Sequence, residues 1–374
     1  MLMSLGEELW VRFFPKFITA SGGSLGMVGA FGSAKDLLEC LYVYAGGRFT
    51  QRVGQRRSLT IYTLIFMLGG MAMLLPGPLW IPIVGALVAS AWSSLSLPVS
   101  FAMLGHYIPR PLLTWAFAFQ SIIRRIPIVI GPIVGGWMLH RWGFVRGVEW
   151  GVIISVVLAL VGLLVISRWI PQNPHGPSNN ETPPAPLRLS RELRQLLTSD
   201  VLGRFGEGLC RNIAVIHVTT ALGMSAAFFG TLIGIQMATS ILLYIPIGYW
   251  SRGREPWPLV IATFIMFAMF PLALAQATTS LGLVVAFIVA GLREIGEPAR
   301  KSLITSLVPV GRESAGVGHY YLWRGLSTVP APFIGASLYS LWGAKSFYVA
   351  ALVAGLGVVF ALGLKRGVTT PKHV

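Results

Sequence analysis

The chain has 374 residues, of which 54% are hydrophobic and only 11% are charged, and its formal net charge is +16. A soluble protein of average composition has about 25% charged residues, so these values exclude an ordinary soluble protein. In a soluble chain such a positive charge points to nucleic acid. Here many of the basic residues fall between long apolar stretches, so we expect a lipid bilayer as partner and no nucleic acid.

Apolar stretches recur along the whole chain. A membrane-spanning helix needs about 20 mainly apolar residues, and twelve segments meet that length. They cover residues 1–20, 25–46, 58–75, 79–105, 112–140, 145–170, 199–222, 225–250, 257–277, 279–301, 314–341 and 345–366. One long polar stretch rich in Pro, Asn and Ser separates six spans from six. We therefore predict an all-α membrane protein with an N-terminal six-helix bundle at 1–170, a cytoplasmic linker at 171–198 and a C-terminal six-helix bundle at 199–374.

The two halves repeat one another at an offset of 200 residues. Gly6, Glu7, Arg124, Pro132, Gly135 and Trp142 recur as Gly206, Glu207, Arg324, Pro332, Gly335 and Trp342. A repeat of this length indicates a duplicated domain rather than a solenoid of short units. Because each half has an even number of spans, both halves enter the membrane in the same direction, and the repeat is parallel.

The basic residues set the orientation in the membrane. Arg and Lys cluster in alternate loops, including the linker and the C-terminal end. By the positive-inside rule, this pattern predicts a multi-pass protein of the cell (inner, cytoplasmic) membrane with both termini in the cytoplasm.

Charged residues inside the spans are unevenly distributed. A charge at the bilayer centre costs at least about 2.5–3.5 kcal/mol, so such residues normally face a bundle interior or a wet cavity. Spans three, six, nine and twelve have no charge outside their ends, so we predict that these four face lipid. We expect Arg124 and Arg324 to approach one another near the midplane. The predicted cavity and substrate-binding residues are Glu7, Arg12, Lys35, Asp36, Glu39, Arg124, Glu207, Arg211, Arg293 and Arg324.

Many of these charges are spaced for pairing on one helix. Glu8 with Arg12, Lys35 with Glu39, Glu207 with Arg211 and Arg293 with Glu297 are each four residues apart. One interpretation is structural ion pairing within helices. The other is a set of networks that exchange partners during transport. Arg300 and Lys301 are assigned to the cytoplasmic end of the tenth span and are left out of this set.

The tenth span differs most from its counterpart, the fourth. Where it has Arg293, Glu294 and Glu297, the fourth span has Ser93, Ser94 and Leu97. Pro298 cannot donate a hydrogen bond to the carbonyl of Glu294, which predicts a bend. Separating Glu297 from Arg293 would favour proton uptake. We predict that Glu294 or Glu297, with Glu207 as the alternative, carries a coupling proton.

Two segments resemble known motifs. The predicted loop after span two reads Gly47-Arg-Phe-Thr-Gln51-Arg52-Val-Gly54-Gln-Arg56-Arg57 and resembles the G-x-x-x-D-R-x-G-R-R signature of the major facilitator superfamily. Gly131-Pro132-x-x-Gly135-Gly136 in span five is similar to a motif of that family's antiporters, although such glycines also permit close helix packing. The resemblance implies that family's fold and the bacterial drug/proton antiporter-like branch. It also implies a gating role for Gly47, Gln51, Arg52, Gly54, Arg56 and Arg57, with a hydrogen bond from Gln51 in place of the usual acid's ion pair.

No metal-ligand spacing, phosphate loop or catalytic triad occurs in the sequence, so we expect no cofactor, no metal and no enzyme activity. We predict a monomeric secondary active transporter of a small-molecule substrate that works by alternating access. Proton-coupled efflux of a small organic solute is the first hypothesis. The alternatives are uptake or exchange of a small organic anion, and a receptor or scaffold that uses the same fold.

Overall fold

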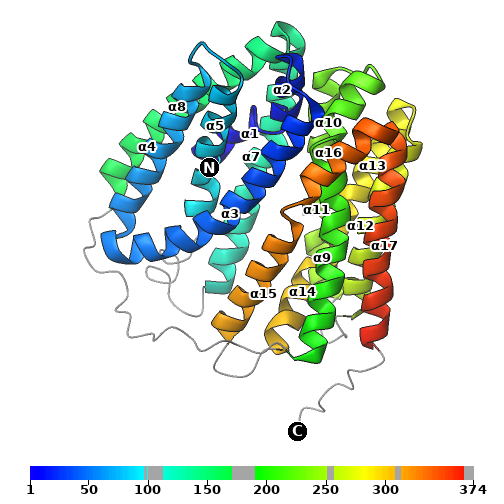
Figure 1. Ribbon diagram of the computed structural model, residues 1–374. Coiled ribbons are helices and arrows are strands. Elements are labelled where there is room, and N and C mark those ends of the chain that lie inside the picture. The colour runs from blue at the N-terminus through cyan, green and yellow to red at the C-terminus, as the bar shows by residue number, and fades with distance from the viewer. Residues whose placement is uncertain (97–98, 100–112, 171–189, 251–256, 308–312, 366–374) are drawn as a thin grey trace. The chain divides into compact units, whose positions relative to one another are not determined.

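The computed structural model describes residues 1–96, 99, 113–170, 190–250, 257–307 and 313–365. These residues are almost entirely helical, and the helices group into twelve spans (Figure 1). In the first half the spans are α1 (Leu2–Glu8) with α2 (Phe14–Ala20), α3 (Leu25–Val53), α4 (Gln55–Met73), α5 (Trp80–Ala89) with the helical residues 91–96, α7 (Leu113–Trp142) and α8 (Phe144–Trp169).

The second half is built in the same way. Its spans are α9 (Arg191–Arg211) with α10 (Ala214–Ile216) and η2 (His217–Ala221), α11 (Ala226–Trp250), α12 (Trp257–Gln276), α13 (Ser280–Leu292) with η3 (Arg293–Gly296) and α14 (Glu297–Ser306), α15 (Glu313–Thr328) with α16 (Ala331–Trp342), and η4 (Gly343–Lys345) with α17 (Ser346–Lys365). The predicted all-α fold of two six-helix bundles is confirmed.

The chain forms two compact units. The first consists of Met1–Asn180 with Val215–Gly234, and the second of Glu181–Ala214 with Ile235–Val374. Each unit has its own apolar core. In the first, Tyr62 of α4 and Leu95 belong to a buried cluster, and in the second, Leu196, Phe264 and Leu303 join α9, α12 and α14.

Four stretches of the described chain are long and apolar enough to cross a membrane by themselves: Phe144–Trp169, Ala226–Leu243, Trp257–Gln276 and His319–Gly363. Three of them contain α8, α12 and α17, which are three of the spans predicted to face lipid. Large apolar side chains such as Leu164 on α8 and Leu352 on α17 are exposed in their units. Exposed apolar faces of this kind suit contact with lipid tails.

The segment from Gly47 to Arg57 was predicted to be a loop, and that prediction is wrong. α3 continues to Val53, and α4 starts at Gln55. Only Gly54 interrupts the helix, with a φ of 88°. A positive φ costs glycine little because it lacks a Cβ, so a single residue is enough to turn one helix into the next.

The arginines of this segment lie at the start of α4 and the end of α3. Arg56 Nη2 donates to the carbonyl oxygen of Ser167 at 2.6 Å, which ties the start of α4 to the end of α8. Arg52 and Arg57 are exposed. The predicted hydrogen bond of Gln51 lies outside the described side chains.

The seventh span begins earlier than the predicted residue 199. Ser190 is the N-cap of α9, and its Oγ accepts a hydrogen bond from the Leu193 amide at 3.1 Å. Serine is a preferred N-cap residue because its oxygen satisfies one of the free amides of the first turn. The basic end of the predicted linker is therefore the first part of α9, and Asp200 lies well inside the helix.

The sequence repeat is also a repeat of backbone contacts. A Cβ added to Gly135 on α7 would lie 2.1 Å from the carbonyl oxygen of Leu9, and a Cβ added to Gly335 on α16 would lie 2.0 Å from the carbonyl oxygen of Leu209. Any side chain at either glycine would collide with the neighbouring backbone. The first and fifth spans of each half therefore pack by the same contact.

A second contact between the first and fifth spans also occurs in both halves, but the glycine lies on the fifth span in one half and on the first span in the other. Gly131 on α7 faces Glu8, with 2.5 Å between an added Cβ and the Glu8 Cβ. In the other half the glycine is Gly208 on α9, and it faces Ala331 at 2.8 Å. One partner in each pair must be glycine because the two helices approach too closely for two side chains.

Candidate functional site

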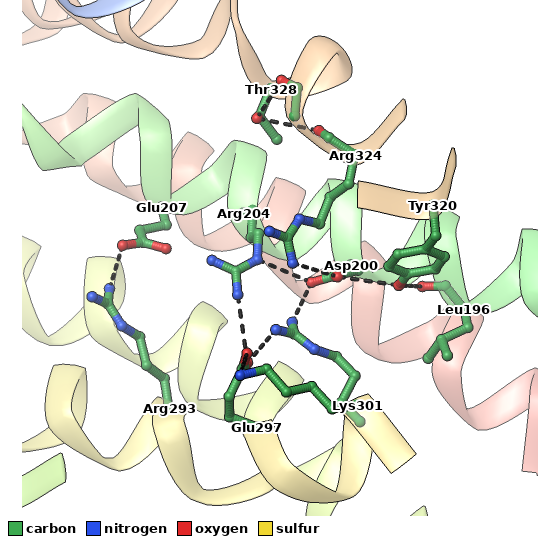
Figure 2. A network of polar contacts seen from close by, with 12 residues as sticks. Leu196, Asp200, Arg204, Glu207, Arg293, Glu297, Lys301, Tyr320, Arg324 and Thr328 are labelled. Carbon is green, nitrogen blue, oxygen red and sulfur yellow. Dashed lines mark hydrogen bonds and ion pairs between the residues drawn. The ribbon is translucent and has the colours of Figure 1, made fainter. Parts of the chain in front are cut away.

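Acidic and basic side chains from several helices of the second unit converge on one site (Figure 2). Asp200, Arg204 and Glu207 share one face of α9, because they are four and three residues apart. The other members come from η3, α14 and α15. We call this set the charge network: Asp200, Arg204, Glu207, Arg293, Glu297, Arg300, Lys301, Tyr320 and Arg324.

Asp200 is the centre of the charge network and is completely buried. Its Oδ1 accepts from Arg300, which is also completely buried, and from Arg204 at 3.2 Å. Its Oδ2 accepts from the Tyr320 hydroxyl at 3.1 Å and from Arg324 at 3.4 Å. Removing one partner of a buried ion pair typically costs about 3–5 kcal/mol. These contacts therefore hold α9, α14 and α15 together.

Glu297 is the second acidic member. It pairs with Arg300, lies 3.6 Å from Arg204, and lies 3.5 Å from the exposed Lys301. Arg300 thus donates to both Asp200 and Glu297, so one guanidinium already bridges two carboxylates.

Glu207 forms the third acidic position, and its Oε1 lies 2.6 Å from Arg293 Nη1. The sequence predicted that Arg293 pairs with Glu297, four residues later, and this is wrong. Residues 293–296 form a 3₁₀ turn, η3, in which about three residues complete a turn, so residues four apart do not share a face. The ring of Phe267 on α12 packs near the guanidinium groups of Arg204 and Arg293, at 5.5 and 5.9 Å from the ring centroid.

Several members of the charge network were not predicted. Asp200 was overlooked because the predicted span started at 199, which placed this residue at a membrane boundary. Its spacing of four from Arg204 was the available signal. Arg300 was assigned to the cytoplasmic end of its span, whereas its guanidinium is fully buried. Nothing in the sequence distinguishes Tyr320 from other tyrosines near an arginine.

In the first unit two ion pairs join residues that are four apart in sequence. Arg12 Nε lies 2.9 Å from Glu8 Oε2, and Lys35 pairs with Glu39 on α3. Both pairs have the predicted spacing of four residues.

Glu7 has a different partner. Its carboxyl group is buried, with 6% of the residue exposed, and it accepts a hydrogen bond from the hydroxyl of Ser93. Ser93 lies in the helical residues 91–96 that follow α5. This contact joins the first span to the fourth.

The remaining predicted cavity residues are placed as follows. Asp36 follows Lys35 on α3, and Arg211 is the last residue of α9. Glu294 lies in η3, beside Arg293. Arg124, on α7, and Arg324 belong to different units, so their approach across the axis stays a prediction.

The four residues of the motif in the fifth span are all packing positions. Gly131 and Gly135 lie against the first span, as described above. A Cβ on Gly136 would lie 2.5 Å from the carbonyl oxygen of Ala226. The carbonyl oxygen of Pro132 would lie 2.0 Å from a Cβ on Gly230 of α11. These contacts support the packing interpretation of the motif.

The chemistry available at these sites is ionic. Carboxylates can bind protons, and guanidinium groups keep their charge and can change partners. Among the described residues no three His, Cys, Asp or Glu side chains are grouped to hold a metal ion.

Comparison with known proteins agrees with this architecture. A family model described as Major Facilitator Superfamily matches residues 5–205 and again residues 201–373. A comparison with curated proteins finds no match.

Solved transporters share the fold at low sequence identity. The nucleoside transporter NupG has a TM-score of 0.75 at 14% identity, with 98% of each chain covered. A bacterial homologue of the iron transporter ferroportin in an inward-facing state has a TM-score of 0.74 at 14% identity, covering 97% of this chain and 96% of that one. A POT family transporter in complex with 5-aminolevulinic acid has a TM-score of 0.71 at 12% identity, covering 98% and 96%. The family match over both halves, together with the twelve spans, shows that the chain belongs to the major facilitator superfamily.

Proposed function

We propose that this protein exports a small organic solute across the cell membrane in exchange for protons. It works by alternating access, as a monomer with both termini in the cytoplasm. Membership of the superfamily makes it an integral membrane transporter and not an enzyme. The observation that carries the rest of the proposal is the charge network, in which acidic and basic side chains of spanning helices share one buried site.

Such a network couples proton binding to helix movement. Opening an ion pair in a buried site leaves an uncompensated charge, which costs several kcal/mol, about 3–5 in measured cases. A proton on the carboxylate removes its charge, so the arginine is free to take another partner. Arg300 already contacts both Asp200 and Glu297, which is the geometry that such an exchange requires.

The three predicted proton carriers lie in or beside this site. Glu207 and Glu297 are members of the charge network, and Glu294 lies in η3 next to Arg293. Because both network members face guanidinium groups, each must separate from its arginine before it binds a proton. We keep all three as candidates for the second unit.

The export direction and the drug/proton antiporter-like branch rest on the resemblance of Gly131-Pro132-x-x-Gly135-Gly136 to the motif of antiporters. Uptake or exchange of a small organic anion is the second candidate. It is favoured by the ion pairs of the charge network, which join five basic side chains to three carboxylates. A receptor or scaffold has no use for charges buried in spanning helices, whose insertion is costly.

Transport by purified protein in liposomes tests this proposal. A panel of labelled lipophilic cations and organic anions is offered to vesicles with an acidic or an alkaline lumen. Proton-coupled export predicts that a substrate accumulates in vesicles with an acidic lumen. An anion that accumulates only in vesicles with an alkaline lumen would establish the second candidate.

The three carboxyls are tested with the same substrate. Glu207→Gln, Glu294→Gln and Glu297→Gln are each measured in pH-driven transport and in counterflow, which needs no proton gradient. Loss of driven transport with counterflow retained assigns the carrier. If all three variants keep the normal pH dependence, none of these three carboxyls carries the coupling proton.

A further inference from the structure

The contact between Glu7 and Ser93 has an equivalent in the other half of the chain. Adding 200 to both residue numbers gives Glu207 and Arg293, which also contact one another. Each pair joins the first span of its half to the fourth. The duplication has therefore kept one carboxyl position and one contact, while the partner differs.

Ser93 and Arg293 differ in the protonation state of the neighbouring carboxyl group with which each can form a hydrogen bond. A guanidinium group only donates hydrogen bonds and always carries its charge, so Arg293 favours ionised Glu207. A hydroxyl group both donates and accepts, so Ser93 can donate to ionised Glu7 or accept from protonated Glu7. Only the pair of Glu7 and Ser93 can keep its hydrogen bond in both protonation states of the carboxyl group.

The surroundings of Glu7 act in the same direction. The residue is 6% exposed, and burial disfavours its charged form, while the charge of the nearby Lys35 favours it. α1 packs against α7 and α8. On α7, Arg124 acts on the N-terminus, and on α8 the Ser155 hydroxyl donates to the carbonyl oxygen of Gly6.

The charged groups that face Glu7 are engaged with other residues. They are Glu8 from α1, and Lys35 and Glu39 from α3. Lys35 is paired with Glu39, and Glu8 is paired with Arg12, so each nearby cation already has a carboxylate of its own.

The helix carrying Glu7 is interrupted beside it. α1 ends at Glu8, and residues 9–13 form turns before α2. The equivalent α9 continues past Glu207 to Arg211. A side chain at a helix end can shift more than one in the middle of a regular helix. The carboxyl group of Glu7 therefore has more freedom to move than that of Glu207.

We propose that Glu7 is a proton-binding carboxyl of the transport cycle, in the first unit, and that Glu207 stays ionised for as long as Arg293 faces it. A hydronium ion transfers its proton to one carboxylate oxygen of Glu7 and leaves as water, and Ser93 then changes from donor to acceptor. No other bond forms or breaks. This inference rests on the proposed function, and it adds a first-unit carboxyl to the three candidates of the second unit.

The test uses the proton itself as the ligand. The purified full chain is reconstituted in lipid and titrated with pH while infrared difference spectra record the carbonyl stretch of protonated carboxyl groups. We expect the wild type to show such a band, with an intensity that changes with pH. Glu7→Gln should remove that band, and the matched variant Glu207→Gln should retain it.

Exchanging the partner sharpens the test. Ser93→Arg gives the first half the partner of the second half, and should move the titration of the band about 1–3 pH units to lower pH. Ser93→Ala removes the hydroxyl donor with little change of volume. It should move the titration of the band slightly to higher pH. This variant provides the test if Ser93→Arg does not fold.

The outcomes separate this inference from the proposed function. If the band persists in Glu7→Gln, or if its titration is the same in both Ser93 variants, Glu7 is not the proton site. If the band behaves as expected but a pH gradient does not drive transport in wild-type vesicles, proton coupling fails while Glu7 remains a proton-binding group. Driven transport in the wild type that survives in Glu7→Gln would show that this carboxyl takes no part in coupling.

Discussion

The two halves of this chain share their packing and differ in their charges. Gly135 against Leu9 and Gly335 against Leu209 make one contact twice, with almost the same distance. At the equivalent polar positions, the first half has Ser93 where the second has Arg293. Helix packing tolerates few alternatives at a close backbone contact, whereas a polar position can change if its partners change with it.

The type of ion pairing also differs between the halves. In the first unit the ion pairs described above lie within α3 and within the first span, between residues four apart. In the second unit Asp200 joins three helices through Arg300, Arg204 and Arg324. The charge network therefore joins helices of the second unit to one another, whereas the Glu8–Arg12 and Lys35–Glu39 pairs each lie within one span.

The largest effect is expected from the shared contact. Gly135→Ala and Gly335→Ala should both prevent folding or destabilise it by more than the roughly 1–3 kcal/mol usual for overpacking, because the new Cβ would meet a backbone carbonyl. The measurement is the yield of monodisperse protein and its Tm in detergent. Gly355→Ala on α17 is the matched control, since an added Cβ there has no neighbour within 4 Å. Destabilisation by only one of the two variants would show that the halves do not pack alike.

The next largest effect is expected at the centre of the charge network. Asp200→Asn should destabilise the protein by about 3 kcal/mol, because the buried Arg300 loses a carboxylate partner. Thermal unfolding of the purified protein measures this change. The double variant Asp200→Asn with Arg300→Met removes both charges and should recover part of the loss. Equal Tm values for wild type and Asp200→Asn would mean that the network does not stabilise the unit.

A smaller effect separates the equivalent pairs. A double-mutant cycle for Glu207→Gln and Arg293→Gln should give a coupling energy of about 1–3 kcal/mol, since the two side chains are 12% and 13% exposed. The cycle for Glu7→Gln and Ser93→Ala should give roughly 0.5–1.5 kcal/mol, the usual size for a hydrogen bond to a neutral group. Coupling energies of equal size in the two cycles would remove the distinction on which the Glu7 proposal depends.

The smallest effect is expected for the pairs within one helix. Glu39→Gln should change stability by only about 0.3–0.5 kcal/mol, because Lys35 and Glu39 are a partly exposed pair four residues apart. Thermal unfolding at low and high salt measures it. A loss as large as that of Asp200→Asn would show that the first unit also relies on charges between helices.

Much of the fold follows from the sequence because its determinants are local. Apolar stretches of sufficient length define the spans, and the offset of 200 identifies the duplication. For the glycines of the fifth span, which resemble an antiporter motif, packing was the alternative interpretation, since a missing side chain permits close approach in any helix pair. The loop predicted around Gly54 was too long, because clustered basic residues are typical of a loop and here lie in helices.

The charge network could not be read from the sequence in the same way. The sequence by itself determined which residues are charged, which spans carry them and that two halves repeat. Tertiary structure alone decided that Arg293 turns to Glu207, that Arg300 is buried and that Asp200 is the centre. The physical reason is that spacing along a chain predicts neighbours only within a regular helix. A 3₁₀ turn rotates the residues that follow it, and partners on different helices have no fixed separation in sequence.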